Sequence, residues 1–551
     1  MARNVSGFPD DPIFAQLLQV ARDVNHVIVH DPGNKVDADY AQLLTDILRM
    51  QTELRAALHQ PMFSDDGILL EQTPYIFILA DGKYEFIVAA FAILSIGGAV
   101  VPLSPTTSPE ETTSLLHRTH STTILTSKTH LSHSTAIQSP ALTSLTILPI
   151  PINTTAKLAI SSPLLTLNPT PTIPATRPAL LLFTSGTSGP PKGVVHTRAL
   201  FHEIHLASGP NHVFLHHRPP NWITGALPLF RHPLAGARME ITPSDPETIW
   251  MRLRAGTEDG VQAVSMLIGP PRFWGSLMKY YRDVIANLPE IERIGYIDGV
   301  QKVKIARVGG TMPHALLVRF WRREIGIPLL VSYGATELGG RGLRTSLETG
   351  LEIERCIGRP QPGVKVRLSE GDHGEMEIWN PVLFSHYLGD EKATKAAFTK
   401  DGYYRTGDLA HREGDEYIFD GRAGEFIKFL GHKISIVELE MRLLEQPFIS
   451  DACVLPVTDA GSNERVAAVI RLQENITQAS ESVLEVLRQR LTDTGLVPGY
   501  MLPTALRVLR QGEEIPRTAS MKVLRRQAAE KFFSLSDRLD FPDSVERWPK
   551  P

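Results

Sequence analysis

The segment LLFTSGTSGPPKGVV, residues 181–195, joins a run of apolar residues to a loop of small and hydroxyl-bearing residues around Lys192. Glycines let backbone N–H groups approach phosphate oxygens, hydroxyl groups donate further hydrogen bonds, and a lysine adds a mobile positive charge. The segment therefore predicts a buried strand that ends in a polyphosphate-binding loop. It is not a Walker loop, because Lys192 is followed by Gly193 instead of Ser or Thr. The residues predicted to hold phosphate are Thr184, Ser185, Gly186, Thr187, Ser188, Gly189 and Lys192.

The residues around this loop follow the pattern of an α/β protein. Between residues 75 and 103, IFILA, YEFIVAAFAILSIGG and AVVPL read as a buried strand, a buried helix stopped by glycine, and a second buried strand. The segments ALLLF, KIARVGG, LLVSYG, KVRL and EMEIW predict further strands, and ALLVRFWRREIG predicts a helix. The predicted fold class is α/β. Because a buried strand leads into the loop, a flexible surface loop is the weaker alternative there.

Residues 104–178 differ in composition, since they are rich in Ser, Thr and Pro and poor in charge. Composition alone favours a linker. The segments TTILTS and LTSLTILPI, in contrast, predict short strands at the edge of a sheet. Both interpretations stay open. The regular pattern that follows predicts one large body over residues 1–420 and a small second domain over residues 421–551.

Length and composition exclude several classes of protein. The 551 residues exceed the usual domain length of about 100 to 200, and 42% hydrophobic with 21% charged residues is ordinary for a globular chain. A net charge of −4 without a long run of one sign argues against nucleic-acid binding. Cys356 and Cys453 are too far apart in sequence for a metal-ligand spacing, and they do not suggest a disulfide framework.

Targeting signals are not evident in the sequence. The longest apolar run, residues 87–103, is interrupted by Ser95 and two glycines and is shorter than the about 20 residues of a membrane helix. The first residues lack the apolar core of a signal peptide, and the last three are not a peroxisomal tripeptide. We therefore expect no transmembrane segment and a cytoplasmic location.

Four further motifs, together with the loop, resemble the adenylate-forming superfamily in the acyl-CoA synthetase branch. They are VSYGATE (331–337), GYYRTGDLA (402–410), GRAGEFIKFLGHKIS (421–435) and PRTASMKVLRR (516–526). The resemblance implies a large N-terminal α/β body and a small mobile α+β C-terminal domain. It also implies ATP, Mg²⁺ and coenzyme A as cofactors, a small carboxylic acid and CoA as partners, and a separate acyl acceptor protein as a possible further partner.

The same resemblance implies a role for individual residues. Tyr333 and Gly334 would lie near the adenine, and Gly309, Gly310 and Thr311 would pack on the nucleotide and the acyl group. Asp408 would accept hydrogen bonds from the ribose, with Arg422 as a second polar contact. Thr336 would bind the α-phosphate and Glu337 would hold the metal. In the C-terminal domain, Lys522 would bridge the substrate carboxylate and the α-phosphate, and Gly431 and His432 would line the pantetheine channel.

Each assignment has a structural alternative. A hydroxyl and a carboxylate at a glycine turn form a hard-oxygen site that suits magnesium, but YGATE alone equally fits a capped helix start. Asp408 and Arg422 could be surface-turn residues. The basic residues around Lys522 could form a solvated strip. The order of five motifs along one chain favours the functional interpretation.

The acid is less well specified. Residues 227–236 and 265–281 are expected to line its pocket, and the second segment is similar to malonyl-CoA synthetases. Those enzymes often carry a basic residue at the position of Ser276, so Arg231, His232 or Arg272 would have to supply the charge for a di- or tricarboxylic acid. Trp222, Phe230, Phe273 and Trp274 could instead wall an apolar pocket for an aryl or fatty acid. An amino acid is disfavoured as the substrate, because amino-acid-activating members of the superfamily carry an aspartate near the first of these segments and this chain has none there.

The sequence thus predicts an AMP-forming acid:CoA ligase that makes an acyl-adenylate and then a thioester, possibly in specialised metabolism. Two alternatives remain. The acyl group could be delivered to a separate carrier protein or another acceptor instead of CoA. The chain could also be a degenerate nucleotide-binding protein, because Gly424, Met521 and Arg231 depart from the usual motifs.

Overall fold

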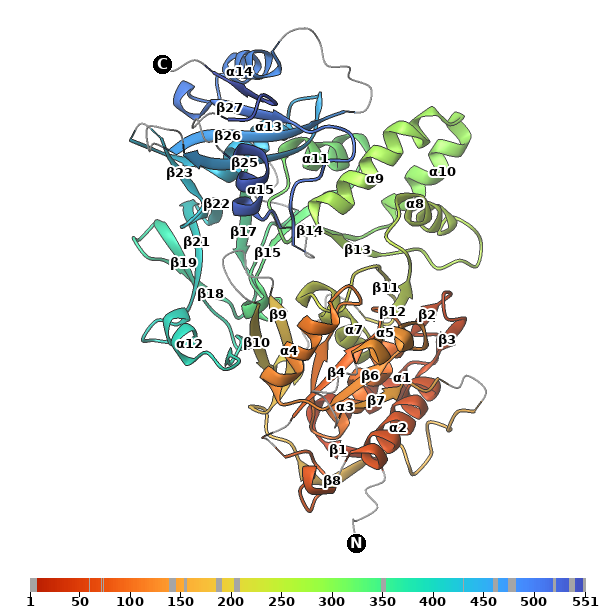
Figure 1. Ribbon diagram of the computed structural model, residues 1–551. Coiled ribbons are helices and arrows are strands. Elements are labelled where there is room, and N and C mark those ends of the chain that lie inside the picture. The colour runs from red at the N-terminus through yellow and green to blue at the C-terminus, as the bar shows by residue number, and fades with distance from the viewer. Residues whose placement is uncertain are drawn as a thin grey trace.

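The computed structural model describes residues 7–58, 60–70, 72, 74–137, 145–152, 156–184, 191–202, 209–347, 353–429, 431–458, 464–473, 482–518, 522–534 and 541–548. It is a mixed α/β protein, as predicted. The N-terminal elements lie at one end of the molecule and the C-terminal strands at the opposite end (Figure 1).

The first sheet has seven strands in the order β20-β10-β9-β5-β4-β6-β7. The predicted strand–helix–strand unit forms its centre, with a fully buried helix between two parallel strands. Gly97 ends this helix with a φ of 78°, and a side chain there would meet Ile68 at 2.4 Å. The elements are β4 (Tyr75–Leu79), α3 (Tyr84–Ser95), β5 (Ala99–Pro102), β6 (Thr123–Thr126), β7 (Thr146–Pro149), β9 (Pro178–Thr184), β10 (Lys192–Thr197) and β20 (His386–Tyr387).

The Ser/Thr/Pro-rich region is folded where the structure describes it. Both predicted short strands form, with β7 at the edge of the first sheet. The helix α4 (Pro109–Thr119) was not predicted; Ser108 caps it by accepting a hydrogen bond from the backbone of Glu111 at 3.2 Å. The other elements here are α5 (Leu131–Ala136) and β8 (Leu167–Thr172), which pairs with β1 (Phe8–Asp10).

A second sheet of thirteen strands runs through the rest of the large body, in the order β18-β19-β21-β22-β17-β16-β15-β14-β13-β11-β12-β2-β3. From β2 to β15 the neighbours in this order are parallel, and from β15 to β18 they are antiparallel. The strands are β2 (Val29–Asp31), β3 (Val36–Ala38), β11 (Val213–His216), β12 (Arg238–Ile241), β13 (Met266–Gly269), β14 (Ile305–Gly309), β15 (Leu330–Tyr333), β16 (Leu343–Arg344), β17 (Cys356–Pro360), β18 (Lys365–Leu368), β19 (His373–Trp379), β21 (Tyr404–Glu413) and β22 (Glu416–Arg422).

Helices cover both faces of the parallel part of this sheet. One face packs an apolar core that contains three stacked or edge-on tryptophans, Trp250, Trp274 and Trp321. The other face packs against α7 and the core of the first sheet. The helices are α1 (Pro12–Asp23), α2 (Tyr40–Ala57), α6 (Ala199–His202), α7 (Ile223–Ala235), α8 (Pro246–Ala255), α9 (Pro271–Asp283), α10 (Glu290–Gln301), α11 (Ala315–Arg319) and α12 (Glu391–Ala397).

The chain leaves the large sheet after Arg422 and enters separate C-terminal sheets at Phe426. A two-stranded hairpin is followed by a four-stranded sheet in the order β25-β26-β27-β28, with apolar cores on both sides. The elements are β23 (Phe426–Phe429), β24 (His432–Ser435), α13 (Ile436–Leu444), β25 (Ile449–Thr458), β26 (Glu464–Leu472), α14 (Val483–Asp493), β27 (Ala505–Val508), α15 (Arg525–Phe533) and β28 (Val545–Arg547).

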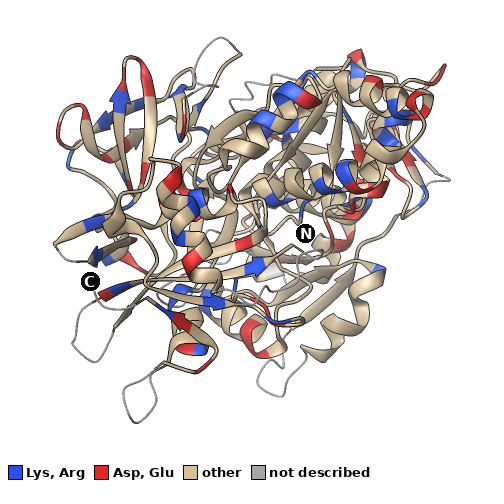
Figure 2. Ribbon diagram, turned by 90° about the horizontal axis from the view of Figure 1, so that it is seen from above, with Lys and Arg blue, Asp and Glu red and all other residues tan. Residues whose placement is uncertain are grey.

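The positions of Lys and Arg and those of Asp and Glu are interspersed along the coloured ribbon (Figure 2). Within the described ranges, no helix has both the length and the apolar character needed to cross a membrane.

Candidate active site

Three residues from separate motifs meet at the centre of the large sheet. Asp408 on β21 lies directly opposite Arg422 on β22, whose Nε donates a hydrogen bond of 2.8 Å to Asp408 Oδ1. The hydroxyl of Tyr333, at the end of β15, donates a hydrogen bond of 2.6 Å to Asp408 Oδ2. Burial, followed by the charge of Asp408, raises the pKa of Tyr333, so the phenol stays protonated and remains a donor. Asp408 thus has a fixed orientation and unused lone pairs on both oxygens.

The two ends of the predicted phosphate loop lie close to Glu337. Thr184 and Lys192 are paired across the β9–β10 hairpin, and β10 pairs in turn with β20. Tyr387 of β20 donates a hydrogen bond of 2.9 Å to Glu337 Oε1, and the Lys192 ammonium lies 5.0 Å from the centre of the Tyr387 ring. Burial raises the pKa of Tyr387, and the charge of Glu337 raises it further. The remaining loop residues, Ser185, Gly186, Thr187, Ser188 and Gly189, lie outside the described residues.

Thr336 is held from the same hairpin. His196 of β10 places its Nε2 2.9 Å from the carbonyl oxygen of Thr336. Glu337 Oε2 forms no hydrogen bond with another described residue, so one carboxylate oxygen is available. No group of three or more His, Cys, Asp or Glu side chains in the described part of the chain could hold a metal ion alone. The donor set therefore fits a magnesium ion that takes one protein carboxylate and completes its shell with phosphate oxygens and water.

The glycine loops stand at the ends of the neighbouring strands. Gly309 ends β14, where a side chain would meet the carbonyl oxygen of Ser332 at 2.5 Å, and Gly310 has a φ of 91°. Thr311 follows them, and Gly334 is exposed directly after β15 with open space where a side chain would lie. Because parallel neighbours end at the same edge of a sheet, both loops border the space above Tyr333.

The three predicted site residues beyond Arg422, which are Gly431, His432 and Lys522, form no hydrogen bond, ion pair or ring contact with the described residues of this site. Lys522 is exposed on a hairpin, where its carbonyl accepts a hydrogen bond of 2.8 Å from the backbone of Thr518. In the described part of the chain, its ammonium group forms no hydrogen bond or ion pair. Gly431 turns the chain between β23 and β24 with a φ of 80°, and His432 stacks on Tyr500 at 3.9 Å.

The four residues predicted to contact the acid lie in different environments. Arg231 on α7 donates a hydrogen bond of 3.0 Å to the carbonyl of Gly339, two residues after Glu337. His232 is buried and stacks on Phe214 at 4.3 Å; burial, followed by the charge of Arg231, lowers its pKa to about 3. Ser276 bonds to its own helix, through the carbonyl of Phe273.

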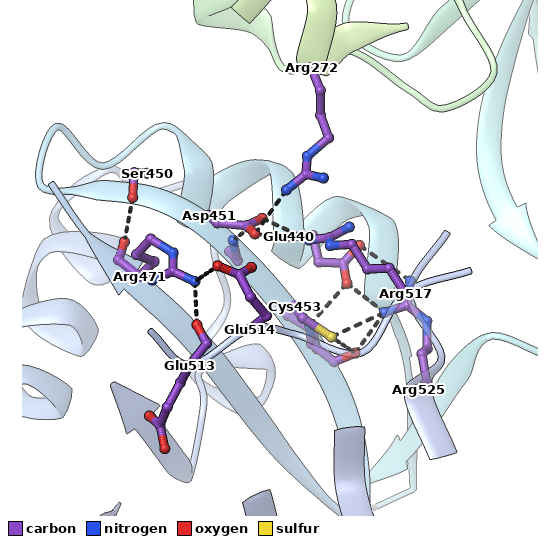
Figure 3. A network of polar contacts seen from close by, with 12 residues as sticks. Arg272, Glu440, Ser450, Asp451, Cys453, Arg471, Glu513, Glu514, Arg517 and Arg525 are labelled. Atoms are coloured by element: carbon purple, nitrogen blue, oxygen red, sulfur yellow. Dashed lines mark hydrogen bonds and ion pairs between the residues drawn. The ribbon is translucent and has the colours of Figure 1, made fainter. Parts of the chain in front are cut away.

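Arg272 points away from the others, towards the C-terminal sheet. Its Nη2 lies 3.4 Å from Asp451 Oδ2, and Asp451 also accepts hydrogen bonds from Arg517 at 2.8 and 3.0 Å (Figure 3). Trp274, considered as a pocket wall, is fully buried and donates to the carbonyl of Arg307, so it belongs to the core.

Sequence reasoning missed Tyr387 and His196, which hold Glu337 and Thr336. Their segments, FSHYLG and KGVVHT, carry no chemical pattern by themselves.

A family model described as AMP-binding enzyme matches residues 67–388, which is more than half of the chain and contains most of this geometry. The chain belongs to the AMP-binding enzyme family. An acyl-CoA ligase of Aspergillus oryzae, oryP, is 34% identical over 548 residues, covering 98% of this chain and 95% of the relative. A mitochondrial malonate–CoA ligase of Mus musculus is 28% identical over 400 residues, or 66% of each chain.

Solved structures share the fold. ATP-bound MatB from Rhodopseudomonas palustris superposes with a TM-score of 0.75 at 19% identity, over 95% of this chain and 98% of that one. The relative from Aspergillus oryzae, at 34% identity over 98% of this chain, confirms the predicted acyl-CoA synthetase branch of the AMP-binding enzymes. With it, the predicted activity is confirmed as ATP-dependent ligation of an acid to CoA through an acyl-adenylate.

Proposed function

We propose that the residues described above carry out two half-reactions with Mg-ATP, a carboxylic acid and CoA. First, an oxygen of the acid attacks the α-phosphorus of ATP, the bond to the β-phosphate breaks, and pyrophosphate leaves. Then the CoA thiolate attacks the acyl carbon, the bond to the AMP oxygen breaks, and AMP leaves. The observation that carries this proposal is that Tyr333, Asp408 and Arg422 contact one another next to Thr336 and Glu337, which follow directly after β15.

The nucleotide would be held by side chains that are already oriented. Asp408 would accept hydrogen bonds from the ribose hydroxyls with the lone pairs that Arg422 and Tyr333 leave unused. The β9–β10 loop and Lys192 would hold the phosphates, and Thr336 would contact the α-phosphate. Glu337 would hold Mg²⁺, whose charge offsets that of the phosphates. Gly309, Gly310, Thr311 and Gly334 would leave room for the nucleotide and the acyl group to lie against the backbone.

We further propose that the C-terminal domain, predicted as residues 421–551, moves from Gly424 onward between the two half-reactions, while Arg422 stays on β22 beside Asp408. Lys522 is exposed and makes no contact with Thr336 or Asp408, so it has to approach the site for adenylation. Gly424 lies in the short connection between β22 and β23, with open space where a side chain would lie, and would permit this rotation. Gly431 and His432 would border the path of CoA in the second state.

The test is pyrophosphate and AMP release from Mg-ATP with a panel of acids, with and without CoA, followed by mass analysis of the thioester. We expect AMP and pyrophosphate with at least one acid and a thioester only when CoA is present. Accumulation of ADP would contradict the proposal. Pyrophosphate release without a thioester would indicate an acceptor other than CoA.

A further inference from the structure

Basic side chains gather where one face of the large sheet meets α7: three lie on strands of the sheet, one follows β11 and two belong to α7. We call this group the basic cluster, and it consists of His216, Arg218, Arg231, His232, Arg307 and Arg344. Arg307 of β14 is paired with Ile268 of β13. Ser332 of β15 is paired with Gly309 of β14 on one side and with Arg344 of β16 on the other. Paired residues point to the same face of a sheet, and so do residues two apart along one strand. Arg307 and Arg344 therefore share one face.

The same face continues to β11 and is the one that α7 covers. Phe214 is level with Met266 of β13, so Phe214 and His216 lie on the face of Ile268 and Arg307. Phe214 stacks on His232 of α7, which fixes the face as the one that faces this helix. Figure 1 shows α7 beside β11. The opposite face, with Val213, Leu215, Leu267, Ala306 and Val308, packs only into the tryptophan-rich apolar core.

Among the residues that the structure describes, the arginines of the basic cluster have no anionic partner. Arg218 is 7% exposed, and its guanidinium forms no hydrogen bond or ion pair with another described residue. The same holds for the Arg307 guanidinium. The Nε atoms of Arg218, Arg307 and Arg344 are buried without a hydrogen-bond partner among the described residues. Arg344 donates only to the side-chain oxygen of Gln361, at 2.6 Å.

Burial and the neighbouring positive charges make the charged forms of these arginines less stable. Burial lowers the pKa of Arg218 and Arg231 to about 10 and of Arg307 to about 9, where the charge of Arg344 adds to the effect. All three guanidiniums still carry their charge at neutral pH. No carboxylate in the described part of the chain contributes to these three shifts. An unpaired buried charge costs several kcal/mol, roughly, so such a cluster calls for an anion that the described residues do not supply.

The basic cluster begins next to the proposed reaction centre. Arg231 donates to Gly339, two residues after Glu337, and Arg307 lies two residues before Gly309, at the end of the same strand. Phe214 and Ile268 add apolar surface between the charged groups. A short carbon chain could therefore place one carboxylate at Thr336 and another among the guanidiniums, where arginine forks match carboxylate oxygens.

We infer that the basic cluster binds a second carboxylate of the substrate, so that the acid activated here is a small di- or tricarboxylic acid. This inference rests on the proposed function. It assigns to Arg218, Arg307 and Arg344 a role in acid recognition that the sequence motifs do not indicate.

A binding experiment tests the site without turnover. We would measure melting temperatures with succinate, glutarate and tricarballylate against butyrate and pentanoate. The variants are Arg218→Met and Arg307→Met, with Arg307→Gln as a second form in case the methionine variant does not fold. Arg55→Met is the matched control, because Arg55 also has a buried, unpartnered Nε but lies on α2.

For wild type and Arg55→Met, we expect at least one polycarboxylate to raise the melting temperature and neither monocarboxylate to do so. For the cluster variants, we expect no rise with any of these acids. Without ligand, the cluster variants should melt at or above the wild type, because they lose an unpaired charge. An equal response to mono- and polycarboxylates, or an undiminished response in the cluster variants, would overturn the inference. So would loss of stabilisation by Mg-ATP in these variants, which would indicate a triphosphate site.

Turnover separates this inference from the proposed function. Pyrophosphate and AMP release with any acid tests the function, whereas the ratio of kcat/KM between polycarboxylates and monocarboxylates of equal length tests the inference. In Arg307→Met we expect KM for the polycarboxylate to rise about 10- to 100-fold, since one hydrogen bond to a charged group is lost, with KM for ATP within about twofold. A preference for the monocarboxylate would refute the inference and leave the function intact.

Discussion

Replacing Asp408 by asparagine tests the proposed ribose contact most directly. The carboxylate now accepts from Arg422 at 2.8 Å and from Tyr333 at 2.6 Å, which leaves unused lone pairs on each oxygen for the two ribose hydroxyls. A hydrogen bond to a charged group contributes about 1.5–3 kcal/mol, against about 0.5–1.5 kcal/mol for a neutral one. Losing the charge should therefore weaken the hydrogen bond to each ribose hydroxyl by about 1–1.5 kcal/mol. For the two hydroxyls together, the Kd for ATP should rise about 30- to 150-fold.

Calorimetric titration with Mg-ATP in the absence of acid measures this Kd. Tyr333→Phe keeps the carboxylate and removes one donor, so we expect a loss of about tenfold or less. Asp401→Asn is the matched control, because Asp401 forms a comparable pair with Arg367, at 2.6 and 3.0 Å, on an exposed part of the same domain. If Asp408→Asn bound ATP as tightly as Asp401→Asn does, Asp408 would not be the ribose acceptor.

Three further predictions concern the C-terminal domain and the acid stability of the body. Lys522→Ala should abolish pyrophosphate release while calorimetry shows unchanged ATP binding; normal pyrophosphate release would remove Lys522 from the reaction. Burial holds the pKa of His217 and of His232 at about 3 in the folded protein, so below pH 6.5 the unfolded chain binds more protons than the folded one. Each histidine should therefore lower the free energy of unfolding by about 1.4 kcal/mol at pH 5.5. Equal melting temperatures at pH 7.5 and 5.5 would argue against this. Arg272→Gln removes an exposed contact and should change the unfolding free energy by less than about 1 kcal/mol, whereas Asp451→Asn also deprives Arg517 of two hydrogen bonds and should lower the melting temperature more.

The sequence predicted the strands and helices that have a clear apolar period. The strand–helix–strand unit at 75–103 and the strands that carry the motifs formed where they were expected. The helix α4 was missed because its Ser, Thr and Pro content resembles a linker, although Ser108 followed by Pro109 and two glutamates is a helix start.

The candidate site was predicted one motif at a time, but its assembly depends on strand order. Tyr333 and Asp408 are 75 residues apart and meet only because the large sheet brings β15, β21 and β22 into one layer. Resemblance also suggested Ser276 and Arg272 as contacts of the acid. In the structure, Ser276 donates a hydrogen bond within α9, and Arg272 contacts Asp451. Arg307 was overlooked because a charged residue in a strand ordinarily indicates a solvent-facing side.

The thirteen-stranded sheet separates two requirements that this chain has to meet. The side chains proposed to hold the nucleotide come from β15, β21 and β22, whereas the basic cluster comes from β11 and the segment after it, β14, β16 and α7. If the basic cluster binds the acid as inferred above, substitutions in it would alter which acid is accepted without disturbing the residues proposed for the nucleotide. A lineage built on this frame could therefore acquire new substrates by drift at a few positions while its energy-coupling chemistry stays the same.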